Sequence, residues 1–238
     1  MRMIMLSLLA LVMAVAARAE SKPPVVVELY TSQGCSSCPP ADAYMGELAR
    51  RSDVIGLSFH VDYWDYIGWK DTFALPAATE RQRRYAEKMN LRYVYTPQMV
   101  IGGRRQEVGS NRNAVETAID YVRMMAPPVH ITFERRGNGG QLRLQGPAPA
   151  KPATVWLAEI DYRRKVRITR GENRARELDY FNVVRRIRPL GTWSGGEALY
   201  DLDLAAIAAA GRDGCVIIVQ EEGSAGPILG ALRIDVSG

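Results

Sequence analysis

The chain has 238 residues, of which 47% are hydrophobic and 24% are charged, a composition typical of a folded globular chain and unlike a long disordered one. This length fits one large domain or two small ones. The formal net charge of +5 is only mildly basic, and no nucleic-acid-binding motif accompanies the arginine-rich runs at 81–84 and 185–188, so we expect no nucleic acid partner. Three cysteines are too few for a disulfide-stapled scaffold, so the core must be hydrophobic.

The first nineteen residues have the pattern of a secretory signal peptide. Arg2 precedes an almost wholly apolar run at 4–16, and Ala17-Arg18-Ala19 offers a small-x-small cleavage site. The run is short for a membrane span, although an uncleaved N-terminal anchor is the alternative. We therefore expect residues 1–19 to be removed and the mature protein to make no contact with a membrane.

The following segment predicts an α/β domain at residues 20–127. The β-branched run at 25–30 predicts a buried strand, and the helical spacing of apolar residues at 41–50, behind Pro39-Pro40, predicts a helix. Further strands are predicted at 54–61, 98–101 and 105–108, and further helices at 79–89 and 113–125; the aromatic segment 63–69 has no clear assignment. The order β-α-β-α-β-β-α predicts a mixed four-stranded sheet with flanking helices.

Residues 128–238 have a different character. Two short strands at 129–135 and 141–145 flank Gly137-Asn138-Gly139-Gly140 and predict a hairpin. More strands are predicted at 154–162, 180–187, 198–203, 215–220 and 228–236, with a short helix at 204–210. Short strands separated by turn residues predict an antiparallel β-sandwich domain.

The motif Cys35-Ser36-Ser37-Cys38 lies between the first strand and the first helix. The unpaired N–H groups and the dipole at a helix N-terminus favour the thiolate form of a cysteine there, and the thiolate is the nucleophile of disulfide exchange. We therefore predict a Cys35–Cys38 disulfide in which Cys35 is the attacking thiol and Cys38 resolves the mixed disulfide. A static disulfide or a metal site are alternatives, but zinc usually requires four ligands. We expect no metal and no other cofactor.

Residues 25–125 resemble thioredoxin and glutaredoxin domains. The resemblance rests on the strand, the C-x-x-C motif and the helix, on the segment 95–103 around Thr96-Pro97, and on Gly109-Ser110-Asn111. The whole chain is similar to the secreted bacterial family of domain of unknown function 1223, through the segments 28–42, 59–65 and 95–97. In that family a thioredoxin-like domain is followed by a β-rich tail. Because the family is secreted, the resemblance also implies a secreted protein, most simply one of the periplasm.

The resemblance implies roles for three further residues, Thr96, Pro97 and Glu28. Thr96-Pro97 would form a cis-proline loop that positions an extended substrate beside the sulfurs, with an ordinary trans proline as the alternative. Glu28 would be the buried acid that shuttles the proton of the second cysteine, unless it faces outward or pairs with an arginine. His60 is a candidate from the sequence itself: it ends the second strand and would tune a nearby thiolate, unless it only completes a hydrogen bond.

Other residues are secondary candidates. Trp64, Tyr66 and Trp69 form either an aromatic wall for a peptide or part of the core, and core packing is the commoner role for such side chains. Asp42 and Arg104 are weaker candidates for the rim of the site. Cys215 lies in an apolar strand, which predicts an inert buried thiol.

Together these features predict an exported thiol–disulfide oxidoreductase. Its partners would be the thiols or disulfides of exported proteins, or a small thiol such as glutathione. Two alternatives remain from the residues alone. One is a non-enzymatic thioredoxin-like binding module, and the other is a Cu(I)-binding protein that uses the same two cysteines, since thiolates suit that soft ion.

Overall fold

The computed structural model describes residues 23–125 and 129–237. We refer to these as the N-terminal region and the C-terminal region. The predicted signal peptide at 1–19 and the predicted domain boundary between residues 127 and 128 lie outside the described residues. Within the two regions, no helix combines the length and the apolar character needed to span a bilayer.

The N-terminal region contains the predicted strands and helices in the predicted order: β1 (Val25–Thr31), α1 (Pro39–Leu48), β2 (Val54–His60), α2 (Pro76–Lys88), β3 (Gln98–Ile101), β4 (Arg105–Val108) and α3 (Arg112–Met125). Helix α2 begins at Pro76 and not at the predicted Thr79, because proline is well tolerated in the first turn, where no backbone donor is needed. The unassigned aromatic segment contains the single turn of 3-10 helix η1 (Asp65–Ile67).

The C-terminal region is mostly strands: β5 (His130–Arg136), β6 (Gly139–Gly146), β7 (Ala153–Arg167), β8 (Glu177–Trp193), β9 (Gly196–Leu202), α4 (Leu204–Ala209), β10 (Gly214–Glu221) and β11 (Ile228–Asp235). Every strand that the sequence predicted here is present. Strands β7 and β8 are much longer than predicted.

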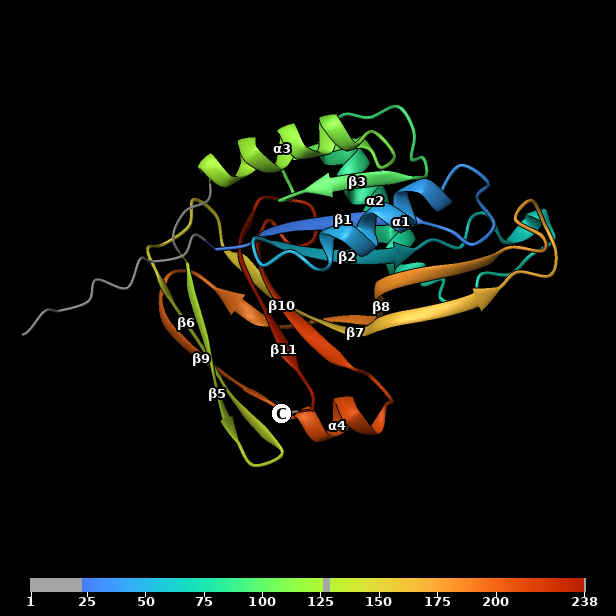
Figure 1. Ribbon diagram of the computed structural model, residues 1–238. Coiled ribbons are helices and arrows are strands. Elements are labelled where there is room, and N and C mark those ends of the chain that lie inside the picture. Colours follow the sequence, from blue (N-terminus) through green and yellow to red (C-terminus); the bar gives the residue numbers. More distant parts are fainter. Residues whose placement is uncertain (1–22, 126–128, 238) are drawn as a thin grey trace, which may run out of the picture.

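Both regions contribute to one mixed sheet of eight strands, in the order β11-β10-β7-β8-β2-β1-β3-β4 (Figure 1). The predicted four-stranded set is the β2-β1-β3-β4 end of this sheet. Strands β1 and β2 are parallel, and β2 meets β8 in parallel through the single pair Ser58–Val183. Strands β5, β6 and β9 form a separate antiparallel sheet of three strands. The structure is therefore α/β, with a large mixed sheet that continues from one region into the other.

Helices cover both faces of the N-terminal part of the large sheet. Because side chains alternate along a strand, β1 presents Val27 and Leu29 to α1 and α3, whereas Val26 and Tyr30 pack on the side of α2. The three-stranded sheet packs on β7, β10 and β11 around an apolar core of its own. Helix α1 also lies against β8 so closely that a Cβ atom on Gly46 would be 2.5 Å from the Phe181 ring, which explains glycine at this position.

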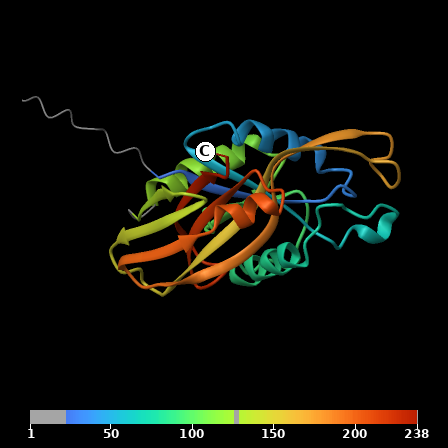
Figure 2. The ribbon, with the colours of Figure 1, turned by 90° about the horizontal axis from the view of Figure 1, so that it is seen from below.

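The ends of β7 and β8 form a long arm, residues 163–181, which projects away from the three-stranded sheet (Figures 1 and 2). Its exposed ion pairs join the two strands, with Arg163 Nε 3.0 Å from Asp179 and Lys165 Nζ 3.2 Å from Glu177. The arm brings the C-terminal region to the start of α1.

Candidate functional site

Cys35 and Cys38 form a disulfide at the start of α1. Strand β1 ends at Thr31, a turn follows, and Cys38 is the N-cap of the helix, with Pro39 and Pro40 in its first turn. The disulfide that the sequence predicted is therefore confirmed, and so is its place at a helix N-terminus. Both cysteines are buried, with 2% of Cys35 and none of Cys38 exposed to solvent.

The Thr96–Pro97 peptide bond is cis, as the sequence predicted, and its loop lies beside the disulfide. The Ser37 hydroxyl lies 3.4 Å from the Cys35 sulfur and 3.5 Å from the Thr96 carbonyl oxygen. Ser37 thus connects the two sequence-predicted parts of the site.

The aromatic segment reaches the same loop. Trp64 Nε1 donates a hydrogen bond of 2.8 Å to the Thr96 hydroxyl, and the Trp64 and Tyr66 rings stack with their centroids 6.5 Å apart. Tyr66 is 80% exposed, whereas Trp64 is half-buried. Trp69 is also half-buried, and its Nε1 donates to the Gln33 side chain. Trp64 and Tyr66 therefore form a partly exposed aromatic surface next to Thr96, while Trp69 supports the turn before Cys35.

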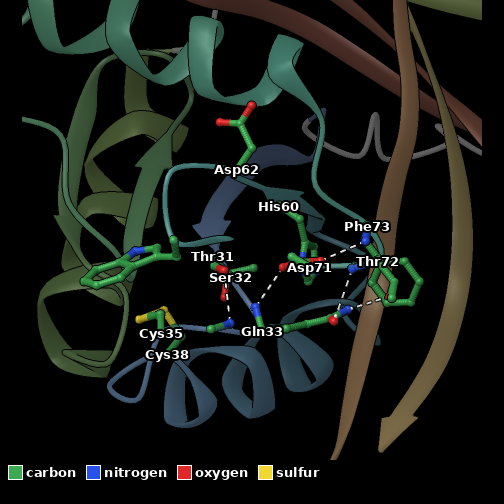
Figure 3. Close-up of polar contacts among 12 residues, drawn as sticks. Thr31, Ser32, Gln33, Cys35, Cys38, His60, Asp62, Asp71, Thr72 and Phe73 are labelled. Atoms are coloured by element: carbon green, nitrogen blue, oxygen red, sulfur yellow. Dashed lines mark hydrogen bonds and ion pairs between the residues drawn. A yellow bond between two sulfur atoms is a disulfide. The ribbon is translucent and has the colours of Figure 1, made fainter. Parts of the chain in front are cut away.

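A cluster of buried polar side chains lies behind the disulfide. It contains Thr31, Asp42, His60, Asp71 and Tyr180, and we call it the disulfide-side cluster. The Thr31 hydroxyl donates to Asp42 Oδ1 at 2.7 Å. His60 Nδ1 lies 2.7 Å from Asp71 Oδ2, and Figure 3 shows this pair on the far side of Thr31 from the two cysteines.

Asp71 is held as a carboxylate. Burial acts to raise its pKa, but the charge of His60, the hydrogen bond to that ring and the N–H groups of Gln33 and Phe73 outweigh burial and lower the pKa below its usual value. Because a carboxylate only accepts hydrogen bonds, His60 Nδ1 carries the hydrogen of the His60–Asp71 bond.

Three atoms of the disulfide-side cluster lack a partner among the described residues. Within the part of the chain that the structure describes, Asp42 Oδ2, His60 Nε2 and the Tyr180 hydroxyl are buried and make no hydrogen bond. The rings of His60 and Tyr180 are 4.8 Å apart. Burial raises the pKa of Asp42 to about 7, against smaller opposing effects of the His60 charge and the Thr31 hydrogen bond. Asp42 can therefore exchange a proton near neutral pH.

The β7–β8 arm contributes Asn173 to the turn before α1. Its side-chain amide donates to the carbonyl oxygens of Gln33 and Cys35, both at 2.9 Å, and Asn173 is 1% exposed. Arg176 donates to the Asn173 amide oxygen and so fixes the orientation of the amide. The backbone on the N-terminal side of the disulfide is thus held by the C-terminal region.

Glu28 lies away from the disulfide. It is on the α2 face of β1, opposite to α1, and is fully buried. Its Oε1 accepts a hydrogen bond of 2.6 Å from Arg81, which also binds the Gln220 side chain of the C-terminal region. Of the roles considered for Glu28 from the sequence, the structure shows the ion pair with an arginine. The buried carboxyl on the side of Cys38 is Asp42.

The cysteines, Thr96-Pro97 and His60 were predicted from the sequence and lie at this site. Asp42 was only a weak candidate, and Asp71, Asn173 and Tyr180 were not predicted. The position of Asp42, four residues after Cys38, was the one local signal available, because residues i and i+4 share a helix face.

The described residues contain no candidate metal site. Among residues 23–125 and 129–237, no group of three or more His, Cys, Asp or Glu side chains is arranged to hold an ion. Cys215 is free and buried, and burial raises its pKa to about 12, which fits the predicted inert thiol.

The chain is similar to one protein family and to two solved structures. The family model described as protein of unknown function (DUF1223) matches residues 26–220. The crystal structure of a protein from Agrobacterium tumefaciens is similar to the chain, with a TM-score of 0.80 and 30% identity over 92% of this chain and 97% of the other. HBP35 of Porphyromonas gingivalis shares the fold, with a TM-score of 0.58 and 13% identity over 90% of this chain and 75% of the other. No curated protein matches the chain.

Proposed function

The chain belongs to the DUF1223 family, and from its own residues we propose that it is a thiol–disulfide oxidoreductase whose Cys35–Cys38 disulfide exchanges with the thiols or disulfides of exported proteins. The observation that carries this proposal is a disulfide at the N-terminus of α1 beside the cis Thr96–Pro97 bond. We propose that residues 20–127 are a thioredoxin-like domain. The signal-like segment 1–19 supports the periplasm as the place of action.

The chemistry follows from the position of each sulfur. Cys35 precedes the helix, so when the disulfide opens its thiolate faces the positive end of the α1 dipole. Cys38 is fully buried within the first turn and closes the disulfide again by attacking a mixed disulfide on Cys35. Thr96 would pair its backbone with an extended substrate, and the exposed Tyr66 ring would contact substrate side chains.

The test is a redox titration of Cys35 and Cys38 in graded glutathione and dithiothreitol buffers, read by alkylation and mass spectrometry. We expect reversible cycling of this pair and no labelling of Cys215 in the folded protein. Cys35→Ser should abolish exchange with a model protein disulfide, whereas Cys215→Ser should leave it unchanged. Unchanged turnover in Cys35→Ser would refute the proposal.

One observation favours a second candidate, a binding module that retains the disulfide as a structural link. Only 2% of Cys35 is exposed, so a substrate thiolate must displace part of the surrounding loops to reach it. A disulfide that stays oxidised in every buffer in which the protein remains folded would favour this candidate.

A further inference from the structure

A pocket of about 140 Å³ lies where α2 meets the C-terminal region. It is on the α2 face of the large sheet, whereas the disulfide lies at the start of α1, on the other face. Its walls come from one side of α2, from β7 and β8, and from the turn between β10 and β11, and they include Glu80, Arg81, Arg84, Trp156, Ile187 and Ser224. Because these elements are distant in the sequence, the pocket forms only in the assembled fold.

Arg81 brings to this pocket a buried donor without a partner. Its side chain is 3% exposed, and its Nε and Nη2 atoms donate to Glu28 Oε1 at 3.0 and 2.6 Å. The remaining nitrogen, Nη1, is buried and makes no hydrogen bond to the described residues. Burying a donor without an acceptor is unfavourable, so Nη1 indicates an acceptor that comes from outside the chain.

Two more donors line the same pocket. Ser224 is 5% exposed, and its hydroxyl oxygen accepts a hydrogen bond of 2.9 Å from Arg84 Nη1. This hydroxyl donates to none of the described residues, so its hydrogen is available. The other nitrogens of Arg84 donate to Glu80 Oε1, in an ion pair whose side chains are 51% and 56% exposed. The buried polar groups of the pocket therefore have donors to offer, and the matching ligand is an acceptor.

The other side of the pocket is apolar. Ile187 and the Trp156 ring line it, and the indole is held in place because Trp156 Nε1 donates to the Gly223 carbonyl oxygen at 3.0 Å. An apolar cavity of roughly 150 Å³ is large enough to hold benzene. The pocket therefore has room for a ligand with a body of about that size.

The charges around the pocket favour a monoanion. Glu28 neutralises Arg81 inside the core, so this pair contributes no net charge. Arg84 is neutralised only by Glu80, whose exposed side chain is free to turn toward solvent. When it does, the pocket has a net charge of +1 and the Arg84 guanidinium presents two nitrogens to a planar carboxylate. A dianion such as phosphate would leave one negative charge unbalanced.

We propose that this pocket binds a small carboxylate with an apolar body, about the size of benzoate. The carboxylate accepts hydrogen bonds from Arg81 Nη1 and the Ser224 hydroxyl and replaces Glu80 as the partner of Arg84. The apolar body lies against Trp156. The inference goes beyond the proposed disulfide exchange and does not depend on it. Because the ligand contacts both regions, its binding stabilises their junction.

The test is a titration of the folded, oxidised protein with benzoate. It is followed by the NMR resonance of the Trp156 indole N–H, assigned with Trp156→Phe, and by thermal unfolding. We expect a saturable shift with a Kd of millimolar order, as is usual for a ligand of this size, and an unfolding midpoint that rises with benzoate concentration. Benzamide has the same shape without the charge and should bind at least about tenfold more weakly.

Variants on α2 test the assigned contacts. Arg84→Gln should weaken benzoate binding at least about tenfold, whereas Glu80→Gln removes the competing carboxylate and should strengthen binding. Arg83→Gln is the matched control, because it removes the same charge from an exposed residue of the same helix outside the pocket, and its Kd should be unchanged. Since Arg81 also neutralises Glu28, the buried donors are tested through Ser224→Ala, which leaves that ion pair intact and should weaken binding.

Three outcomes would overturn the proposal. The absence of a saturable shift at benzoate concentrations far above the millimolar range would mean that the pocket holds water only. Equal affinity for benzoate and benzamide would mean an apolar pocket that does not recognise a carboxylate. Displacement of benzoate by inorganic phosphate at a lower concentration would mean a site for a different anion. None of these outcomes affects the redox titration of Cys35 and Cys38, so the two proposals stand or fall separately.

Discussion

Two buried polar clusters lie on opposite faces of β1, and they differ in how completely their charges are paired. On the α2 face, Glu28 and Arg81 form an ion pair, and Gln220 and Tyr85 complete a network around them. One nitrogen of Arg81 makes no hydrogen bond to the described residues, but the guanidinium lies 5.3–5.9 Å from three aromatic ring centroids. We call this the paired cluster.

The disulfide-side cluster, on the α1 face, is also buried and polar, but its hydrogen bonding is incomplete among the described residues. The Asp42 carboxyl group has a pKa of about 7, and three polar atoms of the cluster have no partner among the described residues. Both clusters therefore contain buried charged side chains, and burial alone does not separate them. The features that set the second cluster apart are its incomplete pairing, the pKa of Asp42 near 7, and the position of Asp42 in the same helical turn as Cys38.

The largest expected effect concerns the paired cluster. Arg81→Met leaves Glu28 as an unpaired buried charge and should lower the free energy of unfolding by about 3–5 kcal/mol, measured by urea titration. The double variant Glu28→Gln with Arg81→Met removes both charges and should recover most of this loss. A changed pH profile of disulfide reduction in the folded double variant would mean that the two clusters are not independent.

The next effect is the pH dependence of stability in Asp42→Asn. The folded pKa of about 7 lies above the ordinary value of 3.8, so between these values the folded protein keeps a proton that the unfolded chain has lost. Asp42 therefore makes its full contribution to the free energy of unfolding below about pH 4, and this contribution is lost as the pH rises to about 7. Asparagine stays neutral, so the variant should be more stable than wild type at pH 8, by on the order of 3–4 kcal/mol.

This difference should vanish at pH 4. The measurement is urea unfolding of both oxidised proteins at the two pH values. An equal stability difference at pH 4 and pH 8 would show that Asp42 ionises as freely as in an unfolded chain.

The smallest effect concerns the link between the regions. Asn173→Ala removes two hydrogen bonds to the backbone around Cys35 and should destabilise the protein by about 1–3 kcal/mol, with faster reduction of the disulfide. Ser58→Ala is the control, because it removes the bond from Ser58 to the Phe181 carbonyl, another contact between the regions. If both variants change the reduction rate equally, Asn173 has no special role beside the disulfide.

Local patterns in the sequence predict the C-x-x-C motif and its surroundings well. The β-branched run, the two cysteines and the paired prolines specify β1, the disulfide and the start of α1, since each depends on neighbours along the chain. The position of Asp42 on the Cys38 side of the helix could be predicted from spacing. Its burial could not, because Thr31, His60 and Tyr180 enclose it from three other elements.

Long-range pairing explains what the sequence did not show. Asn173 is 138 residues from the carbonyl of Cys35 that it binds, and no local pattern connects the two. Strand periodicity predicted β7 and β8 but not their full length, because the charged residues of the arm suggest a loop until their cross-strand partners are known. Nor does periodicity indicate that β8 lies next to β2.

The β2–β8 junction also bears on how such a chain can evolve. Domains joined only by a linker can be exchanged between proteins by recombination, because each keeps its own surface. Here, loss of the C-terminal region would leave β2 as a bare sheet edge and uncover Leu57 and Phe59, which pack in one core with residues of β7 and β10. The two regions are therefore constrained to be inherited together, and a change in one must be accommodated by the other.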